Sequence, residues 1–91
     1  MISATSGYRL LTISVRIRRK LHGVLRGNRT QTPCLVTATD YEVPPGSPPY
    51  VEYAIEAVAA DLPDDVYTLI VDEEELRVIL RAGEWHVIGR V

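Results

Sequence analysis

The stretch of residues 66–91 constrains the fold of this chain most, because two turns placed in it independently produce one apolar face. These turns stand at residues 73–74 and 82–83. The pairs they create are Val71 with Leu76, Leu69 with Val78, Tyr67 with Leu80, Leu80 with Trp85, and Val78 with Val87. A capped helix that ends at Gly83 is the other interpretation, but it does not explain the shared face. Because strand side chains alternate between two faces, we expect a three-stranded antiparallel meander.

A second alternating segment runs over residues 11–21. Its apolar residues are Leu11, Ile13, Val15, Ile17 and Leu21, and polar or charged residues stand between them. This period of two predicts a half-buried strand. Arg19 is the one charged residue on the apolar face, so we expect it to reach the edge of the sheet or to pair with an acid.

Residues 34–43 are expected to pair with this strand in a long hairpin over residues 11–43. Candidate turns occur at His22-Gly23 and at Gly27-Asn28. With one residue bulged near these glycines, the expected pairs are Leu21 with Leu35, Val15 with Tyr41, Ile13 with Val43, and, on the reverse face, Arg16 with Asp40. Without the bulge an acid would meet Val15, so the bulged pairing is favoured.

The segments that follow are less uniform. Residues 44–49 hold four of the six prolines and predict a stiff surface loop. Residues 50–62 fit a strand by alternation and a short helix by a stripe of tyrosine, alanine and valine. Their alanine content and the preceding Ser-Pro-Pro favour the helix slightly. At the other end of the chain, residues 1–8 are expected to form a flexible arm.

Together these elements predict one domain over residues 1–91, of mainly β class, forming a small antiparallel barrel or sandwich of about five strands. A length of 91 residues falls in the range of single domains. No apolar run predicts a signal peptide or a membrane span. Cys34 is the only cysteine and cannot form an intrachain disulfide, so we expect a cytoplasmic location.

Few residues offer reaction chemistry. The only imidazole and thiol groups are His22, His86 and Cys34. Their spacing favours neither a nucleophile with its base nor a metal site. A cluster of carboxylates consists of Asp61, Asp64 and Asp65, and it is expected to form a solvated turn because it lacks the rhythm of a calcium loop. We expect no catalytic residue, no cofactor and no metal, and a small hydrolase or metal-dependent enzyme is the third hypothesis.

Basic and acidic residues are separated along the chain. Every basic residue up to Arg29 precedes the first acid, Asp40, and acids dominate afterwards. The residues that could form a stripe along phosphates are Arg16, Arg18, Lys20, Arg26 and Arg29. No aromatic residue lies between Tyr8 and Tyr41 to stack on a base, and the isoelectric point is about 5.6. Nucleic-acid binding is therefore the second hypothesis, and the simpler one is that the stripe meets the protein's own acids.

The second face of the meander is the candidate surface for self-association. Its residues are Ile70, Ile79 and Ile88, with Arg77, Arg81, His86 and Arg90. Such a face is too apolar to remain fully in water. Either a helix over residues 50–62 covers it or a second copy of the chain does. We expect a homodimer that uses this face or the edge strand beside it, and hence a non-enzymatic binding or assembly module.

Overall fold

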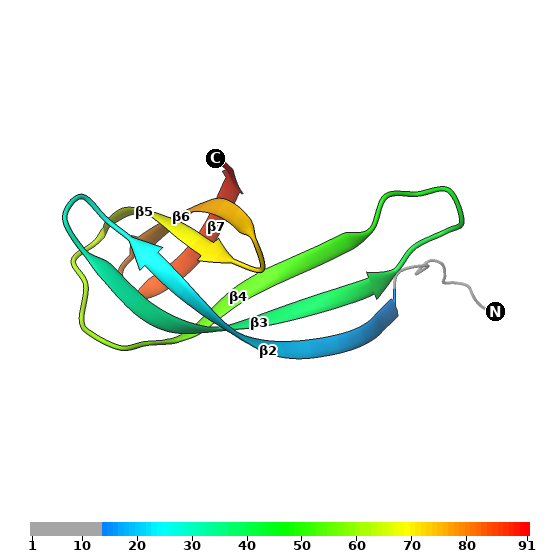
Figure 1. The fold of residues 1–91 in the computed structure, drawn as a ribbon, viewed down its shortest axis with the longest axis horizontal. Helices are drawn as coiled ribbons and strands as arrows, with labels where there is room; N and C mark the ends of the chain where they lie inside the picture. Colours follow the sequence, from blue (N-terminus) through cyan, green and yellow to red (C-terminus); the bar gives the residue numbers. More distant parts are fainter. Residues whose placement is uncertain (1–13) are drawn as a thin grey trace.

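The computed structural model describes residues 14–91, which form six strands (Figure 1). The strands are β2 (Ser14–Arg26), β3 (Gln31–Glu42), β4 (Tyr50–Val58), β5 (Asp65–Val71), β6 (Glu74–Arg81) and β7 (Glu84–Arg90). These residues contain no helix, and therefore none that could cross a membrane. The expected flexible arm at residues 1–8, the first residues of the strand predicted from residue 11, and the expected pair of Ile13 with Val43 lie outside the described residues.

All six strands belong to one antiparallel sheet in the order β4-β3-β2-β5-β6-β7. The sheet curls until its two edge strands, β4 and β7, approach each other, and it forms a nearly closed barrel. The predicted fold class is confirmed, with six strands where about five were expected. The barrel has two halves: the amino-terminal half, made of β2, β3 and β4, and the meander, made of β5, β6 and β7.

Both halves contribute to the core between them. The most deeply buried large side chains are Leu25, Val36, Leu69, Val71 and Val78. In the meander the buried positions follow every second residue, as a curled sheet with one interior face requires. Fully burying one Leu or Val side chain is worth roughly 1.5–3 kcal/mol, so this shared cluster is the main apolar link between the halves.

The strands of the amino-terminal half are longer than those of the meander and extend past it. The far part of this half continues as a twisted three-stranded ribbon, which we call the arm and define as residues 14–20, 37–42 and 50–54 (Figure 1). The molecule is accordingly 54 Å long and 28 × 21 Å across. At the tip of the arm, residues 44–49 make a turn in which Ser47 N donates to Pro44 O at 3.0 Å. Residues 44–49 thus form a mostly exposed loop at the surface, and its stiffness stays a prediction.

The β2–β3 hairpin turns at one of its two candidate sites. Gly27 N donates to Thr30 O at 2.9 Å, so the turn predicted at this glycine is confirmed and the one at His22-Gly23 is wrong. Strand β2 runs through Gly23, where an added Cβ would lie 3.2 Å from Ile70 O. The absence of a side chain at this position thus serves the close approach of β2 to β5, and not a turn.

The bulge of this hairpin lies at Arg16, near the start of β2, and not near the glycines. Val15 pairs with Tyr41 as predicted, because this pair lies on the Ser14 side of the bulge, where the register is the predicted one. Beyond it Leu21 faces Val36, one residue away from the predicted partner. The alternation of residues 11–21 does not reveal a bulge inside it, since a bulge changes the pairing with the neighbouring strand and not the composition.

The meander over residues 66–91 is confirmed, but its first turn lies at Asp72-Glu73, one residue earlier than predicted. The φ angles there are 55° and 63°, both left-handed, as in a type I′ turn. Leu69 consequently faces Leu76, a shift of two residues from the expected pairing. A shift of two keeps every side chain on its face, so the predicted apolar residues still enter the core.

The second turn of the meander lies at Ala82-Gly83, as predicted. Leu80 pairs with Trp85 and Val78 pairs with Val87, which confirms both expected contacts. The register then shifts by one residue, because Gly89 faces Arg77 and Ile88 has no direct partner on β6. This bulge changes the face on which the last residues of β7 lie.

Residues 50–62 contain strand β4, so the slight preference for a helix is wrong. Val51, Tyr53 and Ile55 are half-buried and alternate with exposed residues. They pair with β3, whose edge supplies hydrogen-bond partners along most of the strand. This tertiary pairing overrides the helical tendency of the alanines, which is a weak local preference.

Candidate interaction surfaces

The three residues with reaction chemistry are not all brought together. His22 on β2 and Cys34 on β3 line a shallow depression of about 290 Å³, whereas His86 lies on β7. Burial raises the pKa of the Cys34 thiol, so this side chain behaves as a small apolar residue of the core. Within residues 14–91 no group of three or more His, Cys, Asp or Glu side chains is placed to hold a metal ion.

The carboxylates around the start of β5 are exposed, as expected for a solvated turn. Asp64 accepts a hydrogen bond from Ala82 N at 3.0 Å, and Asp65 accepts one from Val66 N at 2.8 Å. Asp61 is also exposed. These carboxylates therefore help to fix the start of β5 beside the β6–β7 turn.

Two members of the basic stripe meet acids of the same chain. Lys20 Nζ lies 2.7 Å from Glu56 Oε1 and also donates to Thr37 Oγ1 at 2.9 Å. Arg26 pairs with Glu75 at 3.2 Å. The Lys20 hydrogen bond is the main cause that lowers the pKa of Glu56 below its usual range. The simpler interpretation of the stripe, contact with the protein's own acids, is confirmed for these two residues.

The other three members do not form a continuous stripe. Arg16 and Arg18 are exposed on the arm, whereas Arg29 is exposed in the β2–β3 turn at the opposite end of the molecule (Figure 1). The predicted contact of Arg16 with Asp40 is wrong, because the bulge at Arg16 takes it out of register. Asp40 pairs with Arg19 instead. The five cations are thus distributed over the length of the molecule and are not gathered on one surface.

Arg19 makes the ion pairs at the root of the arm. Its guanidinium lies 3.2 Å from the Asp40 carboxylate on β3 and 3.5 Å from the Asp72 carboxylate in the β5–β6 turn. The prediction that Arg19 pairs with an acid is confirmed twice. Its Nε is buried and has no partner among the described residues, so the two ion pairs must offset that cost.

A second polar contact lies beside the first. The Tyr53 hydroxyl on β4 donates to the Glu74 carboxylate at 3.1 Å, and Arg90 on β7 forms an ion pair with the same carboxylate. Burial, and then the hydrogen bond and the charge of Glu74, raise the pKa of Tyr53 to about 12. The hydroxyl therefore stays a neutral donor. Both halves of the barrel hold the acidic turn through these groups.

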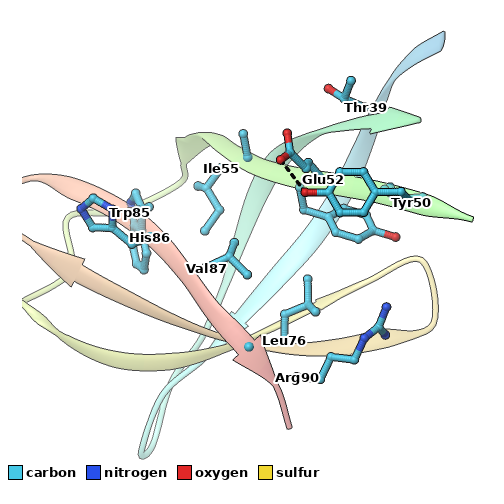
Figure 2. Close-up of a pocket in the computed structure, with 13 residues that line it drawn as sticks. Thr39, Tyr50, Glu52, Ile55, Leu76, Trp85, His86, Val87 and Arg90 are labelled. Atoms are coloured by element: carbon cyan, nitrogen blue, oxygen red, sulfur yellow. Dashed lines mark hydrogen bonds between the residues drawn. The ribbon is translucent and has the colours of Figure 1, made fainter. Parts of the chain in front are cut away.

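A cleft of about 620 Å³ lies between β4 and β7, where the barrel is not closed by strand pairing (Figure 2). Its apolar lining includes Ile55, Leu76, Trp85 and Val87. Polar residues border it as well, and those labelled in the figure are Thr39, Tyr50, Glu52, His86 and Arg90. His86 borders the cleft from the edge strand β7, where it pairs with Ile79 of the second face of the meander. The cleft follows from the divergence of the arm from β7, which the sequence does not reveal.

Arg90 lies in this cleft and not on the second face of the meander, so its predicted placement is wrong. It pairs with Leu76, whose side chain points into the core. The bulge at Ile88 causes the change, because one extra residue reverses the alternation for the residues that follow.

The outer face of the meander keeps the other predicted residues. Ile70 and Ile79 are half-buried, and Ile88 is 55% exposed at the bulge. The basic residues Arg77, Arg81 and His86 are exposed, with Nε2 of His86 3.8 Å from Glu84. Val66, which pairs with Ile79 and is 44% exposed, also belongs to this face. The alternation of residues 66–71 was the signal that could have added it.

The arm carries further exposed apolar side chains, which the sequence analysis did not identify. Val15, Ile17 and Tyr50 are each 42–47% exposed. The rings of Tyr41 and Tyr50 lie 5.4 Å apart, and both hydroxyls donate to the Glu52 carboxylate at 2.9 Å. The alternation of residues 11–21 was expected to bury one face of its strand. It does not do so where the strand extends past the barrel.

Comparison with known proteins does not identify a relative: no family model, no curated protein and no solved structure matches this chain. The surfaces described above are therefore interpreted from their own geometry.

Proposed function

We propose that this protein is a non-enzymatic assembly module that self-associates through the outer face of the meander. One observation carries the proposal: this face presents a group of large apolar side chains with no helix of residues 14–91 over it. The group consists of Val66, Ile70, Ile79 and Ile88. Of the two covers expected from the sequence, the helix over residues 50–62 is absent because β4 occupies that segment. The second copy is the cover that remains, which supports the proposal.

The arrangement of side chains on this face suits a two-fold interface. Ile79 lies between Val66 on β5 and His86 on β7, at the middle of the face. Charged residues, including Arg77 and Arg81, stand around it. An apolar centre with a charged rim is the usual anatomy of a protein interface, and the rim sets orientation more than affinity. In a symmetric dimer each copy would contribute the same patch.

Nucleic-acid binding by Arg16, Arg18, Lys20, Arg26 and Arg29 is the alternative function. The ion pairs of Lys20 with Glu56 and of Arg26 with Glu75 weigh against it, because phosphates would compete with partners already in place. The proposal includes a cytoplasmic location, since a buried single cysteine suits a reducing compartment.

Sedimentation velocity of two matched variants tests the proposed interface. Ile79→Glu puts a charge at the centre of the outer face, so the dimer should dissociate. Ile17→Glu makes the same chemical change on the arm, where the side chain is 47% exposed, and the dimer should persist. Far-UV circular dichroism establishes that both variants are folded. Unchanged sedimentation of folded Ile79→Glu, or dissociation by Ile17→Glu alone, would exclude the outer face as the interface.

A further inference from the structure

The two halves of the barrel share a short backbone connection. Strand β2 pairs with β5 at three positions, from Val24 with Ile70 to Arg26 with Thr68. By comparison, β2 and β3 pair along nearly their full lengths. On the opposite side of the barrel β4 and β7 approach each other without strand pairing. The β2–β5 ladder is therefore placed like a hinge, and the β4–β7 cleft is the side that can widen.

Side chains of the amino-terminal half contact residues 72–74 of the meander at two points, in addition to the ion pair of Arg26 with Glu75 at 3.2 Å, which lies beside the β2–β5 ladder. Arg19 on β2 pairs with Asp72 at 3.5 Å, and Tyr53 on β4 donates to Glu74 at 3.1 Å. Both contacts join residues that no strand pairing connects. Within the meander, Glu74 also forms an ion pair with Arg90 on β7, which lines the cleft. A displacement of the turn would therefore also displace a residue of the cleft.

We propose that residues 72–74 form a latch that holds the two halves together, and that release of this latch widens the cleft between β4 and β7. The ladder at Val24–Arg26 acts as the hinge and stays intact. Gly23 lies next to the hinge, where any side chain would press on the backbone of β5. This inference concerns the movement of the halves and does not depend on the proposed self-association.

The geometry explains why a latch is needed. Within residues 14–91 no strand pairing joins β4 to β7, so the core cluster and side-chain contacts such as these hold the two edges of the sheet near each other. Contacts with charged groups are worth more than ordinary hydrogen bonds when partly desolvated. Arg19 is about one-third exposed and Tyr53 is half-buried, so both contacts are partly shielded from water. Their loss should shift the population toward an open barrel without unfolding either half.

Trp85 reports on this movement, because it is the only tryptophan and lines the cleft beside Ile55. Its ring packs against Tyr67 of the meander at a centroid distance of 5.4 Å, so it stays with that half when the cleft widens. Quenching of its fluorescence by acrylamide in the full chain measures how accessible the ring becomes.

The test compares two double variants with the wild type. Asp72→Asn with Tyr53→Phe removes the ion pair with Arg19 and the hydroxyl donor to Glu74, and asparagine tolerates the left-handed backbone of residue 72. Lys20→Met with Glu56→Gln is the matched control, since it removes an ion pair that lies wholly within the amino-terminal half. The latch variant should raise the quenching constant by about twofold or more, and the control should not change it.

The latch is excluded if the folded Asp72→Asn and Tyr53→Phe variant shows the quenching constant of the wild type. It is also excluded if the control raises the constant equally, because the effect would then be general loosening. Far-UV circular dichroism establishes that the sheet is intact in each case. Should the double variant unfold, Asp72→Asn alone replaces it under the same criteria, with a smaller increase expected.

Discussion

Arg19 on β2 and Asp72 in the β5–β6 turn form an ion pair of 3.5 Å, although 53 positions of sequence separate them. The pair links the root of the arm to the meander, and Tyr53 on β4 makes a second link of this kind through Glu74. A turn that looks in the sequence like a solvated run of acids is thus a contact between the two halves. Its charges serve the tertiary structure.

The Tyr53 contact predicts how stability responds to alkaline pH. Its folded pKa of about 12 lies above the usual tyrosine value of roughly 10. The contribution of Tyr53 is therefore complete below pH 10 and is lost as pH rises toward the folded pKa, because the unfolded chain loses this proton first. Chemical denaturation at several pH values should show a flatter alkaline profile for Tyr53→Phe. Equal alkaline slopes for the two proteins would contradict the assignment.

The core of the meander predicts a large difference between two substitutions in β6. Val78 is fully buried and faces Tyr67 and Val87 across the neighbouring strands, so Val78→Asp should place an unpaired charge in the core. We expect this variant to be unfolded, a loss of more than about 4 kcal/mol. The exposed Arg81→Gln should change stability by less than about 0.5 kcal/mol. Urea denaturation followed by circular dichroism measures both, and a cooperative transition for Val78→Asp would oppose this account of the core.

The first turn of the meander predicts a stabilising substitution. Glu73 has a φ of 63°, a left-handed conformation that costs a side-chain residue energy and glycine very little. Glu73→Gly should therefore raise the free energy of unfolding by about 0.5–1 kcal/mol. In β6 the same change, Glu75→Gly, should lower it, since glycine weakens a strand and the pair with Arg26 is lost. A thermal melt in which Glu73→Gly is less stable than the wild type would contradict the turn geometry.

Nucleic-acid binding should be absent or very weak. Lys20 and Arg26 have acidic partners, and Arg29 lies at the other end of the molecule from the arm. Fluorescence anisotropy with single- and double-stranded oligonucleotides in low salt should show no saturable binding. Steeply salt-dependent binding that is lost when Arg16, Arg18 and Lys20 become alanine would establish the alternative function instead.

The sequence predicts those features that depend on alternation along a single strand. The meander is an example. Its first turn is predicted at residues 73–74 and lies at Asp72-Glu73, yet the same apolar residues enter the core. The partner of Arg19 could be predicted only as a type, an acid, since its identity depends on how the sheet curls. The segment of strand β4 fits a helix slightly better by composition, because its pairing with β3 is not visible in the local sequence.

The candidate surfaces likewise divide into those that alternation along a strand predicts and those that it does not. The outer face of the meander was predicted from alternation and retains Ile70 and Ile79. Arg90 was misplaced, since a bulge at Ile88 leaves no mark in the pattern of residue types. The cleft and the arm could not be predicted, because they arise where strands of unequal length diverge from a curled sheet.

The native mass of the wild-type protein tests the central claim, self-association, most directly. One chain has a mass of 10.2 kDa, so a dimer has twice that mass. Sedimentation equilibrium over a wide range of protein concentration should reach the mass of two chains. A mass that stays at one chain at the highest concentration would show that the outer face of the meander is left open to water, and the assembly function would have to be abandoned.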